Sequence, residues 1–210
     1  MSDYGGMTLD KYRDALASND PTPGGGTASA VALSQGAALA VMVCKLTLSS
    51  EKWKSGWDGA VLANEIAEPL LEIGHQLAYE DAHSFDGVMA AYKLPKETEE
   101  DKNIRNEAIQ NGLLEAAKVP LQTAKHSYKL LHSLEELART GNSNAVTDVG
   151  VSALLATAAC KGALFNVEVN LKSLPDKICQ NIQLEHDEIK QKCREKAREI
   201  MHCVHNRMHS

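Results

Sequence analysis

Two aspartates stand where a carboxylate could transfer a proton. Asp81 lies in the segment LAYEDAHSFDGVM, within a helical pattern, although aspartate has a poor propensity for helix interiors. It is either an exposed residue on a solvated face, with Glu80 and Asp86 beside it, or a carboxylate that faces a pocket as general acid or base. Asp148 follows a Gly/Asn-rich turn, where it caps the next helix, lines a pocket, or does both.

Three consecutive glycines, Gly24 to Gly26, lie between prolines and Thr27 and precede a run of small uncharged residues. A glycine loop that enters a helix leaves free backbone N–H groups at the positive end of the helix dipole, where an anion can bind. The loop is neither the GxGxxG that follows a strand nor the GK[ST] of a phosphate loop. On its own it is more typical of a tight turn than of a ligand site.

Asn166 and Asn170 are four residues apart, so they share one helix face. Their amides either hydrogen-bond a ligand or a partner backbone, or mark the exposed end of that helix. The other candidate cluster, near the C-terminus, has metal-binding residue types. Helical spacing does not gather all of its members, so we expect no metal site. The cluster consists of His202, Cys203, His205 and His209.

The composition of the 210-residue chain excludes several classes of protein. Its net charge of −6 argues against nucleic acid as a partner, because phosphate binding needs a basic face. Two Phe, two Trp and five Tyr are few, and cores of Ala, Val and Leu are typical of packed helices. Five cysteines without CxxC spacing and a polar N-terminus indicate reduced thiols in a cytoplasmic protein without a signal peptide.

The uncharged run Thr27–Cys44 is 18 residues long, so it could be considered as a membrane span. However, it is rich in Ala, Ser, Thr and Gln and has no centre dense in Leu, Ile or Phe. It also lacks interfacial aromatic residues at both ends. We therefore expect a buried helix of a soluble bundle.

Hydrophobic spacing predicts about six helices, and no segment alternates convincingly with the period of two that indicates a strand. Two long helices each contain an internal proline, Pro69 and Pro120, which should kink them. Two buried small-residue helices follow the glycine loop and the 141–144 turn, and a charged helix follows Pro175. Because no flexible linker is visible, we expect one all-α domain over residues 1–210.

The first predicted helix is short and amphipathic. Thr8 should cap it, and Leu9, Tyr12 and Leu16 share one face. Small residues on the two buried helices should let neighbouring helices approach closely. If these two helices pack side by side, their N-terminal loops lie near one another or meet across a dimer.

Taken together, four segments resemble the cyclodeaminase/cyclohydrolase family of folate enzymes. They are PTPGGGTASAVALSQGAALAVMVCKLT, DAHSFDGVMAAYKLPKETEEDK, AAKVPLQTA and GNSNAVTDVGVSALLATAACKGALFNVEVNL. They occur in the family's order across most of residues 21 to 176, and jointly they are highly specific. The family includes the C-terminal domain of formiminotransferase-cyclodeaminase and free-standing methenyltetrahydrofolate cyclohydrolases. The resemblance implies an all-helical, dimer-forming fold.

The resemblance also implies roles for individual residues. The family's catalytic aspartate, in the pattern D-A-x-x-F, falls on Asp81, and we expect Asp148 to orient or supplement it. Together with these carboxylates, the glycine loop and the Gly/Asn turn should form the walls of one folate pocket. The implied substrate-binding residues are Gly24, Gly25, Gly26, Thr27, Gly141, Asn142, Asn166 and Asn170.

The implied substrate is a tetrahydrofolate derivative. A cyclodeaminase would convert 5-formimino-tetrahydrofolate to 5,10-methenyl-tetrahydrofolate and ammonia. A cyclohydrolase would instead convert 5,10-methenyl- to 10-formyl-tetrahydrofolate, and a non-catalytic folate-binding or scaffolding protein is a third hypothesis. No formiminotransferase domain precedes residue 1, so we expect that activity to be absent. We further expect a homodimer with no metal or other cofactor and with neither a membrane nor a nucleic-acid partner.

Overall fold

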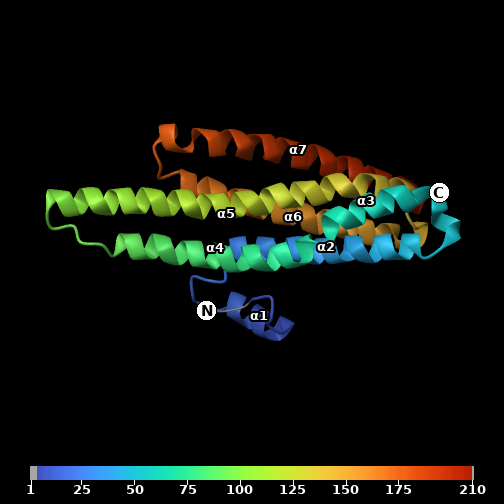
Figure 1. The fold of residues 1–210 in the computed structure, drawn as a ribbon, viewed down its shortest axis with the longest axis horizontal. Coiled ribbons are helices and arrows are strands. Elements are labelled where there is room, and N and C mark those ends of the chain that lie inside the picture. The colour runs from blue at the N-terminus through green and yellow to red at the C-terminus, as the bar shows by residue number, and fades with distance from the viewer. Residues whose placement is uncertain (1–3, 210) are drawn as a thin grey trace.

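The computed structural model describes residues 4–209, which form a bundle of long helices along a common axis (Figure 1). These residues contain no β-strand, so the predicted all-α fold is confirmed. The helices are α1 (Leu9–Leu16), α2 (Gly25–Leu48), α3 (Trp57–Ala67), α4 (Leu70–Tyr92), α5 (Glu99–Thr140), α6 (Val146–Leu171) and α7 (Asp176–Met208), with short 3₁₀ helices at Glu51–Gly56 and Ser143–Ala145.

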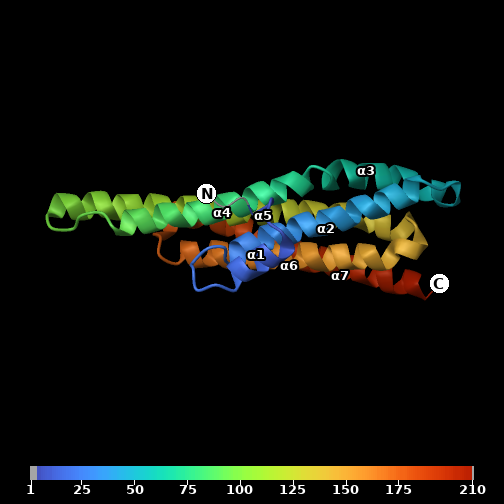
Figure 2. The same ribbon diagram turned by 90° about the horizontal axis from the view of Figure 1, so that it is seen from below.

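Helices α2 and α6 lie side by side and antiparallel, and small residues set the distance between them (Figure 2). The Ser152 hydroxyl of α6 donates a hydrogen bond to the Gly36 carbonyl of α2 at 2.7 Å. A Cβ atom on Gly162 would collide with the Ser29 hydroxyl of α2. The α4 helix approaches α2 in the same way, because a Cβ atom on Gly74 would lie 2.9 Å from a backbone oxygen. The close packing predicted from the small residues is therefore confirmed.

The predicted kink at Pro69 separates α3 from α4. Glu68 and Pro69 keep right-handed helical backbone angles, so the chain does not turn back on itself there. Proline has no N–H, so it cannot bond to the carbonyl of Glu65, and the helical hydrogen-bond ladder is interrupted. Helices α3 and α4 are the two arms of the kinked helix predicted for residues 60–92.

Helix α5 continues through Pro120 over its 42 residues. Because Pro120 has no N–H, the carbonyl of Ala116, four residues earlier, loses its usual partner. The side-chain amide of Asn170 on α6 donates to this carbonyl at 3.0 Å, and also to the Asn166 carbonyl at 3.0 Å. The α6 side chain thus replaces the hydrogen bond that the proline removes, and it joins α6 to α5.

Local signals at the helix ends and in the core match the structure. Thr8 caps α1, and Thr98 caps α5 in a capping box with Asp101. All five cysteines are free thiols, and Cys44 and Cys160 are fully buried in the core, as expected of small core residues.

Apolar side chains remain exposed on α2 and α6. By length and composition, Gly25–Leu48 and Ser143–Leu171 could each cross a membrane, yet half of the apolar window of each is buried inside the bundle. Several apolar side chains of the other half of α2 and α6 face outward. These are Met42, Leu46, Val151, Leu154, Phe165 and Val169, each between 38% and 65% exposed.

Candidate active site

Helix α4 places Asp81 against the N-terminus of α2. The Thr27 hydroxyl donates a hydrogen bond to Oδ2 of Asp81 at 3.2 Å. Gly26 lies directly beneath the carboxylate, because a Cβ atom there would lie 2.5 Å from the Asp81 Cγ. Asp81 therefore faces the glycine loop rather than a fully solvated helix face, and only glycine leaves room for its carboxylate at this position.

The surroundings of Asp81 make it suited to proton transfer. Burial raises the pKa of the Asp81 carboxyl above its ordinary value. Hydrogen bonds from the hydroxyl and the backbone N–H of Thr27 act in the opposite direction and lower that pKa, but burial is the larger effect. A carboxyl whose pKa is raised holds a proton more readily than an exposed aspartate, which suits it to act as a base and then as an acid.

The other glycines of the loop and Asn166 complete this end of the bundle. No side chain caps α2 at Gly24, and within the first turn of the helix the backbone N–H of Thr27 donates to Asp81. A Cβ atom on Gly25 would lie 3.7 Å from Nδ2 of Asn166, which donates to the Gly162 carbonyl at 2.9 Å. The structure thus brings the glycine loop, Asp81 and Asn166 together.

The turn that includes Gly141 and Asn142 lies at the opposite end of α2. The backbone N–H of Asn142 donates to the Thr47 hydroxyl at 3.0 Å. Thr47 is twenty residues beyond Thr27, about 30 Å along the helix at the usual rise per residue. Because α2 and α6 run antiparallel, the two loops do not form one pocket within a single chain. Asp148, in the first turn of α6, lies at the Asn142 end as well.

Asn170 has a structural contact that its sequence pattern did not reveal. Its amide donates to the carbonyl that Pro120 leaves unpaired on α5 and to the Asn166 carbonyl. Its predicted contact with substrate therefore remains a prediction, and its amide N–H groups already have protein partners.

Helix α1 adds a group at the Asp81 end that sequence reasoning did not single out as functional. Leu9 is 83% exposed and α1 buries no residue, so the predicted apolar face of this helix is not part of the core. The Tyr12 hydroxyl is nevertheless buried and has no hydrogen-bond partner among residues 4–209. Burial, the nearby Tyr4 and the charge of Asp81 raise the pKa of Tyr12 to about 12.

Two hollows of about 690 and 750 Å³ lie along α6 and α7, away from Asp81. His186, Asp187 and Lys190 contribute to both. Within residues 4–209, no three His, Cys, Asp or Glu side chains are grouped as metal ligands would be. Asp81 and its neighbours are therefore the site with the most specific chemistry in this part of the chain.

The chain is similar to known proteins in sequence and in structure. Residues 8–193 match the model of the family described as formiminotransferase-cyclodeaminase. The chain is 39% identical to the methenyltetrahydrofolate cyclohydrolase of Methylorubrum extorquens, over 82% of this chain and 83% of that protein. It is 35% identical to the formimidoyltransferase-cyclodeaminase of Rattus norvegicus over 74% of its own length, but spans only 29% of that protein. The crystal structure of formiminotetrahydrofolate cyclodeaminase from Thermotoga maritima matches with a TM-score of 0.85 and 29% identity, over 95% of this chain and 96% of that one.

Proposed function

The chain belongs to the formiminotransferase-cyclodeaminase family, and from this premise we propose that it is a folate one-carbon enzyme that acts between N5 and N10 of tetrahydrofolate. One observation carries the proposal. The Asp81 carboxyl, whose pKa is raised by burial, is held by Thr27 above Gly26 at the end of the bundle where α2 begins. This arrangement supports a reaction that depends on proton transfer.

The first candidate reaction is cyclodeamination of 5-formimino-tetrahydrofolate. N10 attacks the formimino carbon, loses its proton, and the former imine nitrogen leaves as ammonia once it has been protonated. Asp81 accepts the proton from N10 and delivers it to the leaving nitrogen, which takes one further proton from solvent and departs as ammonia, so one carboxyl serves as base and then as acid. Such transfer is typically worth about 10² to 10⁴ in rate. The similarity to a solved cyclodeaminase along nearly the whole of both chains supports this reaction.

The second candidate is hydrolysis of 5,10-methenyl-tetrahydrofolate. Water attacks the methenyl carbon and gives up a proton to Asp81, the bond from that carbon to N5 breaks, N5 takes a proton, and 10-formyl-tetrahydrofolate forms with net release of one proton. The specific observation in its favour is the 39% identity to a methenyltetrahydrofolate cyclohydrolase of similar extent. Both reactions share the 5,10-methenyl compound and the same proton-transfer group.

A paired assay decides between these reactions. The purified chain receives 5-formimino-tetrahydrofolate and 5,10-methenyl-tetrahydrofolate in separate cuvettes, while ammonia and the methenyl chromophore are followed. A chromophore gain with ammonia release identifies a cyclodeaminase, and a chromophore loss above the spontaneous rate identifies a cyclohydrolase. Folate binding without turnover of either compound would overturn both candidates in favour of the non-catalytic hypothesis.

We propose further that the enzyme acts in the cytoplasm and needs no metal or other cofactor. Proton transfer through Asp81 and orientation of the substrate supply the chemistry of either reaction without them. The free thiols and the net charge of −6 agree with a cytoplasmic protein that binds no nucleic acid. Full activity after dialysis against a chelator is the expected result, and a loss that added metal restores would contradict it.

The exposed apolar side chains of α2 and α6 support the homodimer that we propose. Contiguous exposed apolar surface is uncommon on monomers and usually indicates an interface. A second copy packed across a two-fold axis perpendicular to these helices would bring the Asn142 end of that copy, which also holds Asp148, to the glycine loop of the first. Light scattering should give about twice 22.7 kDa. A 22.7 kDa species, or binding of these apolar side chains to lipid vesicles, would contradict the dimer.

A further inference from the structure

The Tyr12 hydroxyl is in an unusual state for a buried polar group. Its oxygen has no solvent contact and no hydrogen-bond partner among residues 4–209. A buried hydroxyl without a partner loses its hydration and gains nothing in return, which is why such groups are few in folded proteins. The buried hydroxyl therefore destabilises the fold slightly, and a bound molecule that accepts its hydrogen bond would remove this cost.

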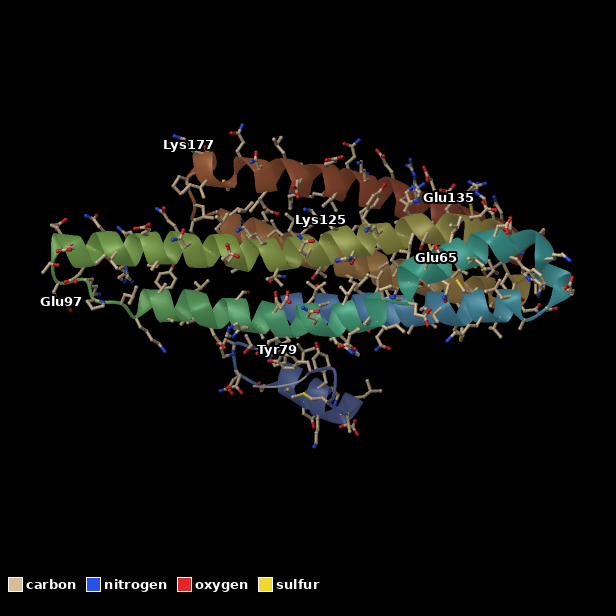
Figure 3. All side chains as sticks on the ribbon, viewed as in Figure 1. Glu65, Tyr79, Glu97, Lys125, Glu135 and Lys177 are labelled. Atoms are coloured by element: carbon tan, nitrogen blue, oxygen red, sulfur yellow. The ribbon has the colours of Figure 1, made fainter. Side chains whose placement is uncertain are left out.

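Several contacts place Tyr12 at the Asp81 end of the bundle. The backbone of the preceding segment packs on α4, because a Cβ atom on Gly5 would lie 2.9 Å from the His75 ring. The Tyr4 ring stands edge-on to the Tyr12 ring, with 6.2 Å between ring centres. Figure 3 shows Tyr79 on the side of α4 that faces α1. Tyr12 thus enters from α1 toward the helix that bears Asp81.

The chemistry of Tyr12 in this position is that of a neutral donor. Burial and the Asp81 charge disfavour its phenolate and raise its pKa to about 12, so the hydroxyl is protonated at neutral pH. A neutral phenol beside a carboxylate does not compete with it as a base. It can donate one hydrogen bond to an acceptor that arrives with a ligand.

Helix α1 is attached to the bundle by few buried contacts. Helix α1 is eight residues long and none of its residues is buried. Figure 1 shows it outside the main bundle, next to α2 and α4. A helix attached by so few buried contacts belongs to the less stable parts of a fold, where opening is easiest.

We propose that Tyr12 is a folate-binding residue whose hydroxyl donates a hydrogen bond to an acceptor atom of the bound folate beside Asp81. The proposal deepens the proposed function and rests on it for the identity of the ligand. Tyr12 contacts the ligand, whereas Asp81 transfers the proton. The Tyr12 hydroxyl, which has no partner among residues 4–209, then finds its acceptor on the bound folate.

Two other roles for the hydroxyl predict different results. If it only supported the fold, removing it would lower the melting temperature and leave folate binding unchanged. If it turned toward Asp81 and held that carboxylate, removing it would shift the acid limb of the pH–rate profile to higher pH. A ligand contact instead predicts weaker folate binding, an unshifted limb and a melting temperature of the free chain that is unchanged or higher, because an unpaired buried hydroxyl is gone.

The test compares Tyr12→Phe with the unmodified chain and with Tyr128→Phe, a matched change on α5 away from Asp81. The probe is 5-formyl-tetrahydrofolate, a stable compound in which a carbonyl oxygen replaces the formimino nitrogen. By calorimetry, Tyr12→Phe should bind it roughly tenfold more weakly, the value of one hydrogen bond of ordinary strength. Tyr128→Phe should bind it normally. Unchanged binding by Tyr12→Phe, a lower melting temperature of its free chain, or a shifted acid limb would overturn the proposal.

The binding measurement separates this proposal from the proposed function. Asp81→Asn, tested with the same probe, should bind folate but not turn over either substrate. If Asp81→Asn keeps full turnover, the role of Asp81 fails while the Tyr12 result remains readable. If the unmodified chain does not bind the probe, the folate assignment itself fails, and the Tyr12 proposal falls with it.

Discussion

The Thr27 hydroxyl hydrogen-bonds Oδ2 of Asp81 at 3.2 Å, across 54 residues of sequence. This contact joins the first turn of α2 to the middle of α4, and it turns the carboxylate toward the glycine loop. Burial and this hydrogen bond act on the pKa of Asp81 in opposite directions, and burial is the stronger. The pair therefore sets both the position and the protonation of the group on which the proposed reaction depends.

Asp81→Asn should abolish turnover while it stabilises the fold. Because the folded-state pKa of Asp81 is raised, its contribution to stability is fully present below the unfolded-state pKa and is lost as pH rises through the folded-state value. Asparagine has no such loss, so at pH 7 the variant should be more stable and melt at a higher temperature than the unmodified chain. Activity should fall by about 10²-fold or more. Thermal melts at pH 4 and pH 7 check the sign, and a variant destabilised at pH 7 would contradict it.

Thr27→Val should move the pH dependence of activity. The hydroxyl lowers the pKa of Asp81, so without it that pKa rises further and the limb that requires ionised Asp81 shifts to higher pH. Stability should fall by about 1 kcal/mol through loss of one hydrogen bond. Thr27→Ser keeps a hydroxyl and serves as the control, with an unshifted profile. A pH–rate profile identical for Thr27→Val and the unmodified chain would show that the hydrogen bond does not matter.

Gly26→Ala should impair catalysis more than folding. Its Cβ atom would force the Asp81 carboxylate aside, and a displacement of about 1 Å can cost about 10²-fold in rate. Gly87→Ala, on the same helix as Asp81, meets no atom within 4 Å and should instead stabilise the fold by about 0.5–1 kcal/mol. Steady-state kinetics of both variants measure the loss of activity, and chemical denaturation measures the change in stability. Normal activity of Gly26→Ala would contradict the described packing.

Asn170→Ala should destabilise the fold by about 1–3 kcal/mol, because it leaves the Ala116 carbonyl unpaired. The control is Pro120→Ala, which restores a backbone N–H four residues after Ala116. In that background Asn170→Ala should cost clearly less, and a double-mutant cycle by urea denaturation measures the difference. If Asn170→Ala lowers the free energy of unfolding equally in both backgrounds, the Asn170 amide does not compensate for the missing N–H of Pro120. If Asn170→Ala weakens folate binding without any loss of stability, Asn170 contacts the substrate instead.

Mixing two inactive variants tests whether the site is shared between subunits. If Asp81 works with Asp148 of the partner subunit, Asp81→Asn and Asp148→Asn should each be inactive alone. Refolded together, they should recover up to about a quarter of normal activity, because heterodimers carry one intact site. Recovery near zero would place both residues in one chain's site or in none. Full activity of Asp148→Asn alone would remove that residue from the mechanism.

Much of the fold and part of the site followed from local sequence patterns. Helix starts at Thr8 and Thr98, the kink at Pro69 and the close packing of α2 are properties of short segments, so their residues predict them directly. The family resemblance pointed to Asp81 in the same way, through a pattern of neighbouring residues. Sequence reasoning from helix propensity alone had left its role open.

Only the tertiary structure decided which of these segments meet. The antiparallel course of α2 and α6 brings Asn166 to the glycine loop and takes Asn142 to the far end, a matter of chain direction that no local pattern contains. Packing of α6 against α5 pairs the Asn170 amide with a carbonyl that Pro120 leaves without its helical partner. The tertiary structure also buries the hydroxyl of Tyr12, although the rest of α1 is largely exposed. The sequence determined the helices and the chemical groups, because these depend on near neighbours. Their meeting points depend on packing across the whole chain.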